Sequence, residues 1–226
     1  MALILNIDTA TEKASVGLSL DGVQLAMVEN GNQREHAAFV HSAVEQVLDA
    51  ACRKLAAVDA FAVTSGPGSY TGIRVGLATA KGFCYALSRP LITLNTLQVM
   101  TLAAIETVGN QGHDTLFCPM IDARRNEVFV AIYDAELHEV LVPQHLVLEH
   151  RIFVSFARGR RIIFFGSGSE KFEQMGEQPE GRFEKVEYNT RHLGVLAEQL
   201  FKSKRFSDIS YSEPSYLKDF YTVVKN

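Results

Sequence analysis

One segment of this sequence limits its possible folds more than any other. A short apolar run, Ala60–Thr64, leads into the loop Ser65-Gly66-Pro67-Gly68-Ser69, and an apolar helix is predicted to follow over Tyr70–Leu87. Pro90 ends that helix region, because proline cannot continue a helix. A strand joined to a helix by a short glycine-rich loop is typical of α/β proteins with a partly parallel sheet.

The predicted helix carries an unusual number of small residues. They recur every four positions in two rows, Gly72, Gly76 and Ala80 on one face and Ala78, Gly82 and Ala86 on another. Each interior glycine costs about 1 kcal/mol of helix propensity relative to alanine, a cost accepted where another backbone approaches closely. Arg74 and Lys81 are its only charged side chains. The helix is therefore covered on most sides, either by its own chain or by a partner helix or second copy.

The hydrophobic pattern of the first half predicts a mixed sheet covered by helices. The dipeptide Asp21-Gly22 is a strong signal for a two-residue hairpin. Strands are predicted at 3–8, 14–20, 23–28, 60–64 and 91–94, and helices at 35–53, 70–87 and 98–108. The order β-β-β-α-β-α-β-α indicates a hairpin meander that continues into parallel crossovers.

The second half repeats this theme more loosely. We predict strands at 116–121, 127–133 and 161–165, a helix at 191–204, a turn at 122–126, and loops at 166–168 and 177–181. Charged residues are denser here than in the first half, and a glycine- and asparagine-containing stretch at 109–113 marks the change. We therefore expect two domains, residues 1–108 and residues 109–226.

Composition excludes several classes of protein. The 226 residues are 47% hydrophobic, which is too apolar for a disordered chain. The net charge of −4 argues against independent nucleic-acid binding. The first residues are expected to form a strand rather than a signal peptide, and no apolar run reaches the ~18 residues of a membrane span. Three scattered cysteines form no metal-binding pair, which favours a reducing, cytoplasmic location.

Two polar segments are candidates for binding an anion. The loop residues Gly66, Gly68 and Ser69 precede a helix N-terminus, and with Asp8, Thr9 and Thr11 at the end of the first strand they could bind a nucleotide or another anion. The spacing matches neither a Walker A loop nor GxGxxG, so a tight structural turn is the alternative. Arg124 and Arg125, in the predicted turn, could contact a phosphate or a partner carboxylate, or lie in a solvated hairpin.

No self-sufficient catalytic or metal centre is evident. His36 and His41 are five positions apart, which does not place them on one helical face, and no HExxH motif occurs. No Gly-x-Ser-x-Gly elbow is present, and Cys84 has no histidine close in sequence. We therefore assign no catalytic and no metal-binding residues.

Three segments resemble the bacterial TsaB (YeaZ) family of tRNA threonylcarbamoyladenosine biosynthesis proteins. They are LNIDT at 5–9, SGPGSYTGIRVGLATAKG at 65–82 and IDARR at 121–125. The resemblance extends over nearly the whole chain, including the C-terminal Pro214-Ser215-Tyr216-Leu217-Lys218, where the family usually has arginine in place of Lys218. Ala37 likewise stands where the family has serine.

This resemblance implies an ASKHA fold, with two RNase H-like domains as in actin-type and sugar-kinase-type ATPases. It also implies a partner, TsaD, which transfers threonylcarbamoyl to adenosine 37 of ANN-decoding tRNAs and binds a metal through a His-x-x-x-His pair. Thr96 and Met100 stand at the corresponding positions here. Neither is a usual ligand for a hard metal. The resemblance therefore implies a scaffold without the catalytic metal site.

We accordingly expect a non-catalytic subunit that binds TsaD and, in a larger complex, the ATPase subunit TsaE. The residues expected to contact a partner are Tyr70, Thr71, Arg74, Val75, Ala78, Lys81, His36 and Phe39. Alone, the chain is expected to form a homodimer; ATP or ADP and metal are expected in the partner subunits, and tRNA contact only within the complex. The alternatives are a small ATPase or phosphotransferase and an M22-type metallopeptidase.

Overall fold

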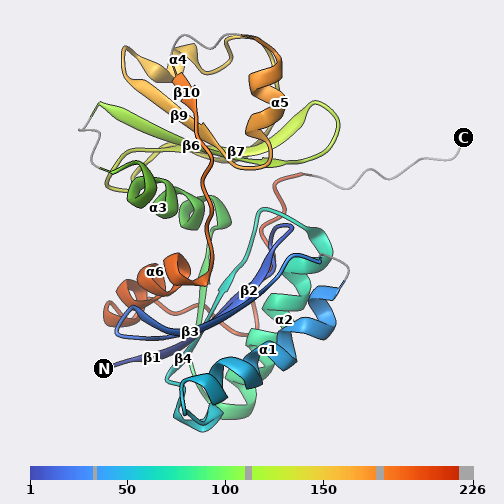
Figure 1. The fold of residues 1–226 in the computed structure, drawn as a ribbon, viewed down its shortest axis with the longest axis vertical. Helices are drawn as coiled ribbons and strands as arrows, with labels where there is room; N and C mark the ends of the chain where they lie inside the picture. The colour runs from blue at the N-terminus through green and yellow to red at the C-terminus, as the bar shows by residue number, and fades with distance from the viewer. Residues whose placement is uncertain (33–34, 110–113, 177–180, 219–226) are drawn as a thin grey trace, which may run out of the picture.

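Two five-stranded sheets form the framework of the computed structural model, which describes residues 1–32, 35–109, 114–176 and 181–218. Their strand orders are β3-β2-β1-β4-β5 and β10-β9-β6-β7-β8. The two sheets lie in separate lobes stacked along the long axis of the molecule, with helix α3 between them (Figure 1). We call the first sheet with α1, α2 and α6 the first lobe, and the second sheet with α4 and α5 the second lobe.

The first sheet is mixed, as the sequence predicts. Its elements are β1 (Leu3–Asp8), β2 (Ala14–Leu20), β3 (Val23–Asn30), α1 (His36–Ala50), a 3-10 turn (Leu55–Ala57), β4 (Ala60–Thr64), α2 (Tyr70–Leu87), β5 (Leu91–Leu94) and α3 (Thr96–Val108). Strands β1, β2 and β3 pair antiparallel, with Asp8 opposite Ser15, whereas β1, β4 and β5 run parallel, with Ile7 opposite Val63. The parallel strands therefore direct their carboxyl ends, and the loops after them, to the edge that faces the second lobe (Figure 1).

The second sheet contains more elements than the sequence predicts. They are β6 (Thr115–Asp122), β7 (Glu127–Tyr133), β8 (Glu139–Val147), α4 (Val154–Ala157), β9 (Arg161–Phe165), α5 (Ser169–Gln174), β10 (Gly181–Phe183) and α6 (Thr190–Lys202). Strands β6, β7 and β9, the turn after β6 and helix α6 confirm the predictions, whereas β8, α4, α5 and β10 were not expected. Gly181 begins β10 rather than ending a loop; residues 177–180 and 110–113 lie outside the described residues.

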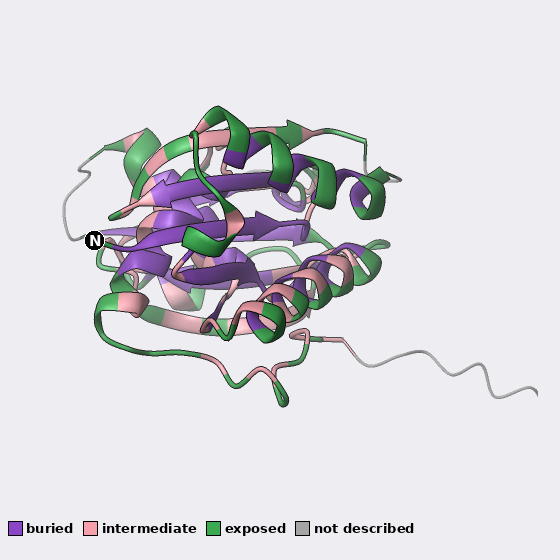
Figure 2. Ribbon diagram, turned by 90° about the horizontal axis from the view of Figure 1, so that it is seen from below, coloured by how far each residue is buried: buried purple, intermediate pink, exposed green. Residues whose placement is uncertain are grey.

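Each face of each sheet is covered by a different set of elements. Helices α1 and α2 pack on one face of the first sheet around Leu5, Val16 and Phe61. Helix α6 packs on the opposite face, where Leu193 and Leu196 meet alternate strand residues such as Ile4. Strands β1, β2 and β4 are accordingly buried between helices whose outward faces are exposed, whereas the edge strand β3 is partly exposed (Figure 2).

Helix α3 and the short helices cover the two faces of the second sheet. Leu97, Met100 and Ala104 of α3 pack on one face of the second sheet, and α4 and α5 cover the other through Phe153 and Phe172. Helix α6, although it follows the second sheet in the chain, belongs by its packing to the first lobe. The domain boundary at residue 109 remains a prediction. After that residue the chain forms the second sheet and then returns to the first lobe with α6. None of the helices among the described residues combines the length and apolarity that a membrane crossing requires.

Candidate functional site

Asp8, at the end of β1, lies in a closed hydrogen-bond cluster. Its side chain is only 2% exposed. One carboxylate oxygen accepts hydrogen bonds from the Thr64 hydroxyl at 2.6 Å and from the Ala10 backbone N–H at 2.9 Å, and the nearby Tyr188 hydroxyl also lowers the pKa of the carboxyl. Burial raises the pKa of Asp8 despite these hydrogen bonds, because desolvation disfavours the charged form.

Thr9, the next residue, fixes helix α2 against the end of β1. Its side chain is fully buried and donates a hydrogen bond to the Gly72 carbonyl at 2.7 Å. A β-carbon at Gly72 would lie 2.0 Å from the Thr9 carbonyl oxygen, and one at Gly76 would lie 2.4 Å from the Thr9 hydroxyl. The row Gly72–Gly76–Ala80 is therefore small because β1 of the same chain packs against it.

The glycine-rich loop is held in place by contacts within its own chain. The Ser69 N–H donates to the Ala10 carbonyl at 2.7 Å, and the Ser69 hydroxyl accepts from the Gly72 N–H at the start of α2. At Gly68 the backbone has φ +154°, and an added β-carbon would lie 2.1 Å from the Ala10 oxygen. Glycine is required here by this close approach of two loops.

A cleft lies between the lobes, above the end of β1. It has two adjoining hollows of about 490 Å³ and about 200 Å³. The walls of both hollows include Thr11, Glu12, Ile121 and Ser167. Of the residues predicted to bind an anion, Thr11, Gly68 and Ser69 line the larger hollow, together with Arg124. Asp8, Thr9 and Gly66 do not line either one.

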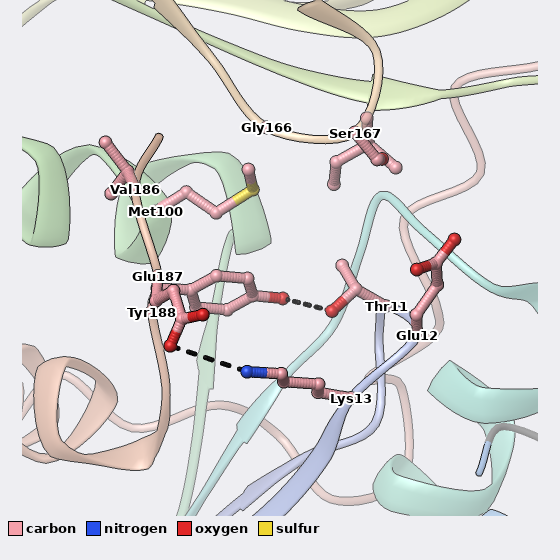
Figure 3. A pocket seen from close by; sticks show the side chains of 10 residues that line it. Thr11, Glu12, Lys13, Met100, Gly166, Ser167, Val186, Glu187 and Tyr188 are labelled. Carbon is pink, nitrogen blue, oxygen red and sulfur yellow. Dashed lines mark hydrogen bonds and ion pairs between the residues drawn. The ribbon is translucent and has the colours of Figure 1, made fainter. Parts of the chain in front are cut away.

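Tyr188 forms the floor of the smaller hollow. Its hydroxyl lies 3.0 Å from the Thr11 hydroxyl, and beside it the Lys13 ammonium pairs with Glu187 at 3.4 Å (Figure 3). Burial and the nearby Asp8 raise the pKa of Tyr188 well above its usual value, so the phenol stays protonated. Sequence reasoning did not identify Tyr188, because it lies in an irregular segment with no motif.

The residues at the end of β1 do not fit a magnesium–nucleotide complex, the group that the ASKHA fold implies. A hydrated divalent cation needs an accessible carboxylate oxygen. The Asp8 carboxylate instead has Thr64 and Ala10 as hydrogen-bond partners and does not line either hollow. We therefore derive no nucleotide chemistry from this cleft.

The positions that correspond to a metal pair in the resemblance also lack suitable ligands. Thr96 is fully buried at the start of α3, and Met100 projects toward the smaller hollow (Figure 3). Among the described residues, one group of acidic and histidine side chains has metal-binding spacing, Asp134, Glu136 and His138, in the turn between β7 and β8. That turn is outside both hollows.

Arg124 and Arg125 lie in the predicted hairpin turn between β6 and β7. Both backbones adopt positive φ, 68° and 51°, and both side chains are exposed. Lys171 of α5 stabilises the turn by donating hydrogen bonds at 2.6 Å to the Asp122 carboxylate and to the Arg125 carbonyl. Arg124 thus stands at the rim of the cleft opposite Tyr70 and Thr71 of α2.

The second row of small residues on α2 has no packing partner within the described chain. Ala78, Gly82 and Ala86 are exposed, and a β-carbon at Gly82 would meet nothing within 4 Å. The expected contact residues Tyr70, Thr71 and Arg74 share this exposed side, with Val75 and Lys81 half-buried. Tyr70 is 42% exposed and Tyr85 is 84% exposed. The exposed tyrosines and Arg74 on this face are residue types enriched at protein interfaces.

Two residues expected to contact a partner do not fit this surface. His36 is 3% exposed and its ring nitrogen bonds the Glu12 carbonyl, whereas Phe39 is 9% exposed and packs in the core of the first lobe. Their contact with a partner stays a prediction, and in this chain the amphipathic face of α1 turns both side chains inward against the sheet.

The stacked lobes and the cleft at the carboxyl ends of the strands define an ASKHA-type protein. A polyphosphate/ATP-glucomannokinase from an Arthrobacter strain shares the arrangement, with a TM-score of 0.53 at 13% identity over 89% of this chain and all of that chain. At this identity the likeness concerns the fold alone. The predicted fold class is confirmed.

Closer comparisons identify the family. A family model described as TsaD, tRNA N6-adenosine threonylcarbamoyltransferase, matches residues 28–220. The Bacillus subtilis tRNA threonylcarbamoyladenosine biosynthesis protein TsaB is 27% identical over 95% of this chain and 93% of its own length. The solved structure of YeaZ from Pseudomonas aeruginosa has a TM-score of 0.82 at 27% identity, over 96% of this chain and all of that chain. The chain belongs to the TsaB (YeaZ) family, within the group that this model describes.

Proposed function

We propose that this protein is a non-catalytic subunit required for threonylcarbamoyl modification of adenosine 37 in ANN-decoding tRNAs. In this proposal it binds and activates a TsaD-type catalytic subunit. Two comparisons support it: the TsaB relative is named for threonylcarbamoyladenosine biosynthesis, and the matching family model is that of the transferase itself. The observation that carries the proposal is the exposed face of α2.

The small residues on that face have no explanation within the described chain. The row Gly72–Gly76–Ala80 makes room for β1, but Gly82 sits in the interior of a helix with open space around it. An exposed interior glycine costs about 1 kcal/mol of helix stability without any benefit from packing. A helix from another protein that packs closely against Ala78 and Gly82 would supply that benefit.

The closed hydrogen-bond cluster around Asp8 supports the non-catalytic part of the proposal. A phosphotransferase or ATPase would require Asp8 to reach a metal–phosphate complex, and Asp8 is instead 2% exposed beneath Tyr188. We propose that ATP or ADP and the metal are bound by the partner subunits and that this chain has no cofactor of its own. Turnover of ATP by the purified chain would favour the phosphotransferase alternative and contradict this proposal, and a tightly bound zinc ion would favour the metallopeptidase alternative.

The exposed face of α2 and the net charge of the chain also suggest how it would associate with itself, with a TsaE-type subunit and with tRNA. Without TsaD, the exposed face of α2 would pair with a second copy, giving a homodimer. A TsaE-type ATPase subunit would join the complex, in the cytoplasm. The net charge of −4 disfavours independent binding to tRNA, so tRNA contact is proposed only within the assembled complex.

Light scattering coupled to size-exclusion chromatography tests the central claim. The chain would be measured alone and mixed with the TsaD protein of the same organism, with and without ATP and the TsaE-type protein. We expect a mixed peak at the summed mass of this chain and TsaD. Separate, unshifted peaks under all conditions, with folding verified by circular dichroism, would contradict the proposal.

A single substitution locates the interface. Ala78→Glu places a charge in the proposed helix contact, and because Ala78 is exposed we expect the fold to be retained. Desolvating that carboxylate should weaken association by several kcal/mol, which amounts to loss of the mixed peak. The matched control is Gln199→Glu. It adds the same charge at an exposed position of α6, which covers the opposite face of the first sheet, and this variant should bind normally. Equal binding by both variants would exclude this face of α2.

A further inference from the structure

The last described residues form a strap, residues 207–218, that runs from β5 along α2 to the second lobe (Figure 1). At its start, the Ser207 N–H donates to the Leu91 carbonyl at 2.8 Å, and the Ser207 hydroxyl lies 2.8 Å from that of Thr93. At its end, Lys218 donates to the Glu127 carboxylate, which also lies 2.9 Å from His145. The strap is thus attached to both lobes.

Between these ends the strap contacts both charged side chains of α2. The Arg74 Nε–H donates a hydrogen bond to the Tyr216 hydroxyl at 2.8 Å, and Lys81 Nζ donates to the Ser212 carbonyl at 3.1 Å. The Ser215 N–H donates to the Ser65 carbonyl at 2.7 Å, which fixes the strap beside the start of α2. The sequence of α2 contains no other ionisable cation.

Aromatic rings complete the arrangement around Arg74. The Tyr70 and Tyr216 ring centroids are 5.3 Å apart, and the Arg74 guanidinium carbon lies 4.3 Å from the centroid of Tyr70 and 6.0 Å from that of Tyr216. Such contacts restrict a guanidinium group while leaving its charge intact. Arg74 is therefore an exposed cation whose side-chain orientation is restricted by these contacts.

The strap holds these cations without neutralising them. Tyr216 supplies a hydroxyl and Ser212 supplies a carbonyl, and neither Arg74 nor Lys81 forms an ion pair with a carboxylate of the described residues. The sequence of α2 has no acidic residue to offset them. Two cations seven positions apart therefore flank Ala78, and among the described residues neither has an ion-pair partner.

We infer that the strap is a positioning element of the docking face: it orients Arg74 and Lys81 to bind carboxylates that the partner protein presents on either side of Ala78. This inference rests on the proposed function, and it specifies the chemistry of the partner surface. Orienting the two side chains before binding reduces the conformational entropy lost in the complex. Paired charges at an interface also accelerate association in a way that salt suppresses.

The first test uses the protein alone. In wild type, the Arg74 side-chain Nε–H should give a resolved, slowly exchanging NMR resonance, because Tyr216 accepts its hydrogen bond. In Tyr216→Phe, which removes the hydroxyl and retains the ring, that resonance should be lost while the backbone spectrum is preserved. Tyr211→Phe is the matched control, since the Tyr211 side chain is 85% exposed in the same strap. An unchanged Arg74 resonance in Tyr216→Phe would show that the strap does not hold this group.

The second test measures affinity for the TsaD-type partner by titration calorimetry at several salt concentrations. We expect Tyr216→Phe to weaken binding by roughly three- to tenfold, the range for a lost hydrogen bond to a charged group. Arg74→Ala should weaken it further and reduce the salt dependence, and Tyr216→Phe should have no additional effect in the Arg74→Ala background. That non-additivity is specific to positioning, because a general loss of stability would not produce it.

The remaining outcomes separate this inference from the proposed function. Wild type that does not bind the partner would overturn both. Wild type that binds, with Tyr216→Phe equal to Tyr211→Phe, would overturn the inference alone. Tighter binding by Tyr216→Phe would also overturn it, because the strap would then be a cover that the partner displaces.

Discussion

At the scale of single residues, Asp8 differs most from what its sequence context predicts. A carboxylate at the end of the first strand, followed by hydroxyl residues, could hold a metal–phosphate group, yet the side chain is buried and hydrogen-bonded within its own chain. Its partners Thr64 and Tyr188 lie far from it in sequence, so no local motif could have indicated them. The Asp8 carboxylate thus packs at the point where the ends of β1 and β4 meet the segment before α6.

The raised pKa of Asp8 predicts how stability depends on pH. The unfolded carboxyl has a pKa of about 3.9. Because the folded pKa is higher, this residue contributes no penalty below that value and lowers the free energy of unfolding as pH rises through the folded pKa. Asp8→Asn retains the side-chain oxygen that accepts from Thr64 and Ala10 and cannot ionise.

We therefore expect the variant to gain stability relative to wild type as pH increases from about 4. Urea unfolding of both proteins across this pH range measures the difference. A constant difference at all pH values would show that the charge of Asp8 does not determine its contribution. Relative destabilisation that grows with pH would show the opposite sign.

At the scale of elements, helix α2 has two rows of small residues with different surroundings. Sequence spacing identified both rows but left open whether its own chain or a partner covers them. The structure resolves this question for one row, since Gly72 and Gly76 contact Thr9. For the other row it shows exposure within the described chain.

Two matched substitutions test this difference. Gly72→Ala places a β-carbon 2.0 Å from the Thr9 carbonyl oxygen, a backbone atom that cannot rotate away. We expect a loss of about 1–3 kcal/mol in the free energy of unfolding, typical of overpacking. Gly82→Ala meets nothing within 4 Å and should gain about 0.5–1 kcal/mol from helix propensity. Thermal or urea unfolding of the isolated chain measures both, and effects of the same sign would contradict this assignment.

The elements that the sequence predicted differ from the missed ones in burial, in length and in their position within the sheet. Strands β1, β2, β4 and β5 are largely buried or flanked by clear turns, so their hydrophobic pattern marks them. Strand β8 contains Pro143, which argues against a strand, but β8 is at the edge of its sheet, where proline is tolerated. Strand β10 has three residues and α5 has six, too few for periodicity to emerge.

For the candidate site, sequence reasoning found local features and missed long-range ones. The α2 surface and the turn carrying Arg124 depend on local spacing and were predicted. The contacts of Tyr188 with Thr11 and of Tyr216 with Arg74 join residues 177 and 142 positions apart. Such contacts arise only from tertiary packing.

At the scale of the whole molecule, the first lobe is completed by α6, the last helix of the described chain. Helix α6 follows the second sheet, but Leu193, Leu196 and Ala197 cover the face of the first sheet formed by Ala2, Ile4 and other strand residues. Arg191 adds an ion pair to Glu106 of α3 at 2.6 Å. The second sheet is therefore inserted, by chain order, between the first sheet and one of its covering helices.

This arrangement predicts that residues 1–108 do not fold stably alone. Without α6, the side chains of Ile4, Ala60 and Ile92, which are fully buried in the whole chain, would lose much of their cover. Exposing apolar area costs about 25 cal/mol per Å², a large share of the 5–15 kcal/mol by which domains are stable. Circular dichroism melting and NMR dispersion of this fragment should show no cooperative fold, and adding residues 184–218 as a separate peptide should restore one. A dispersed spectrum and a sharp melt for 1–108 alone would instead mean that α1, α2 and α3 suffice to stabilise the first sheet.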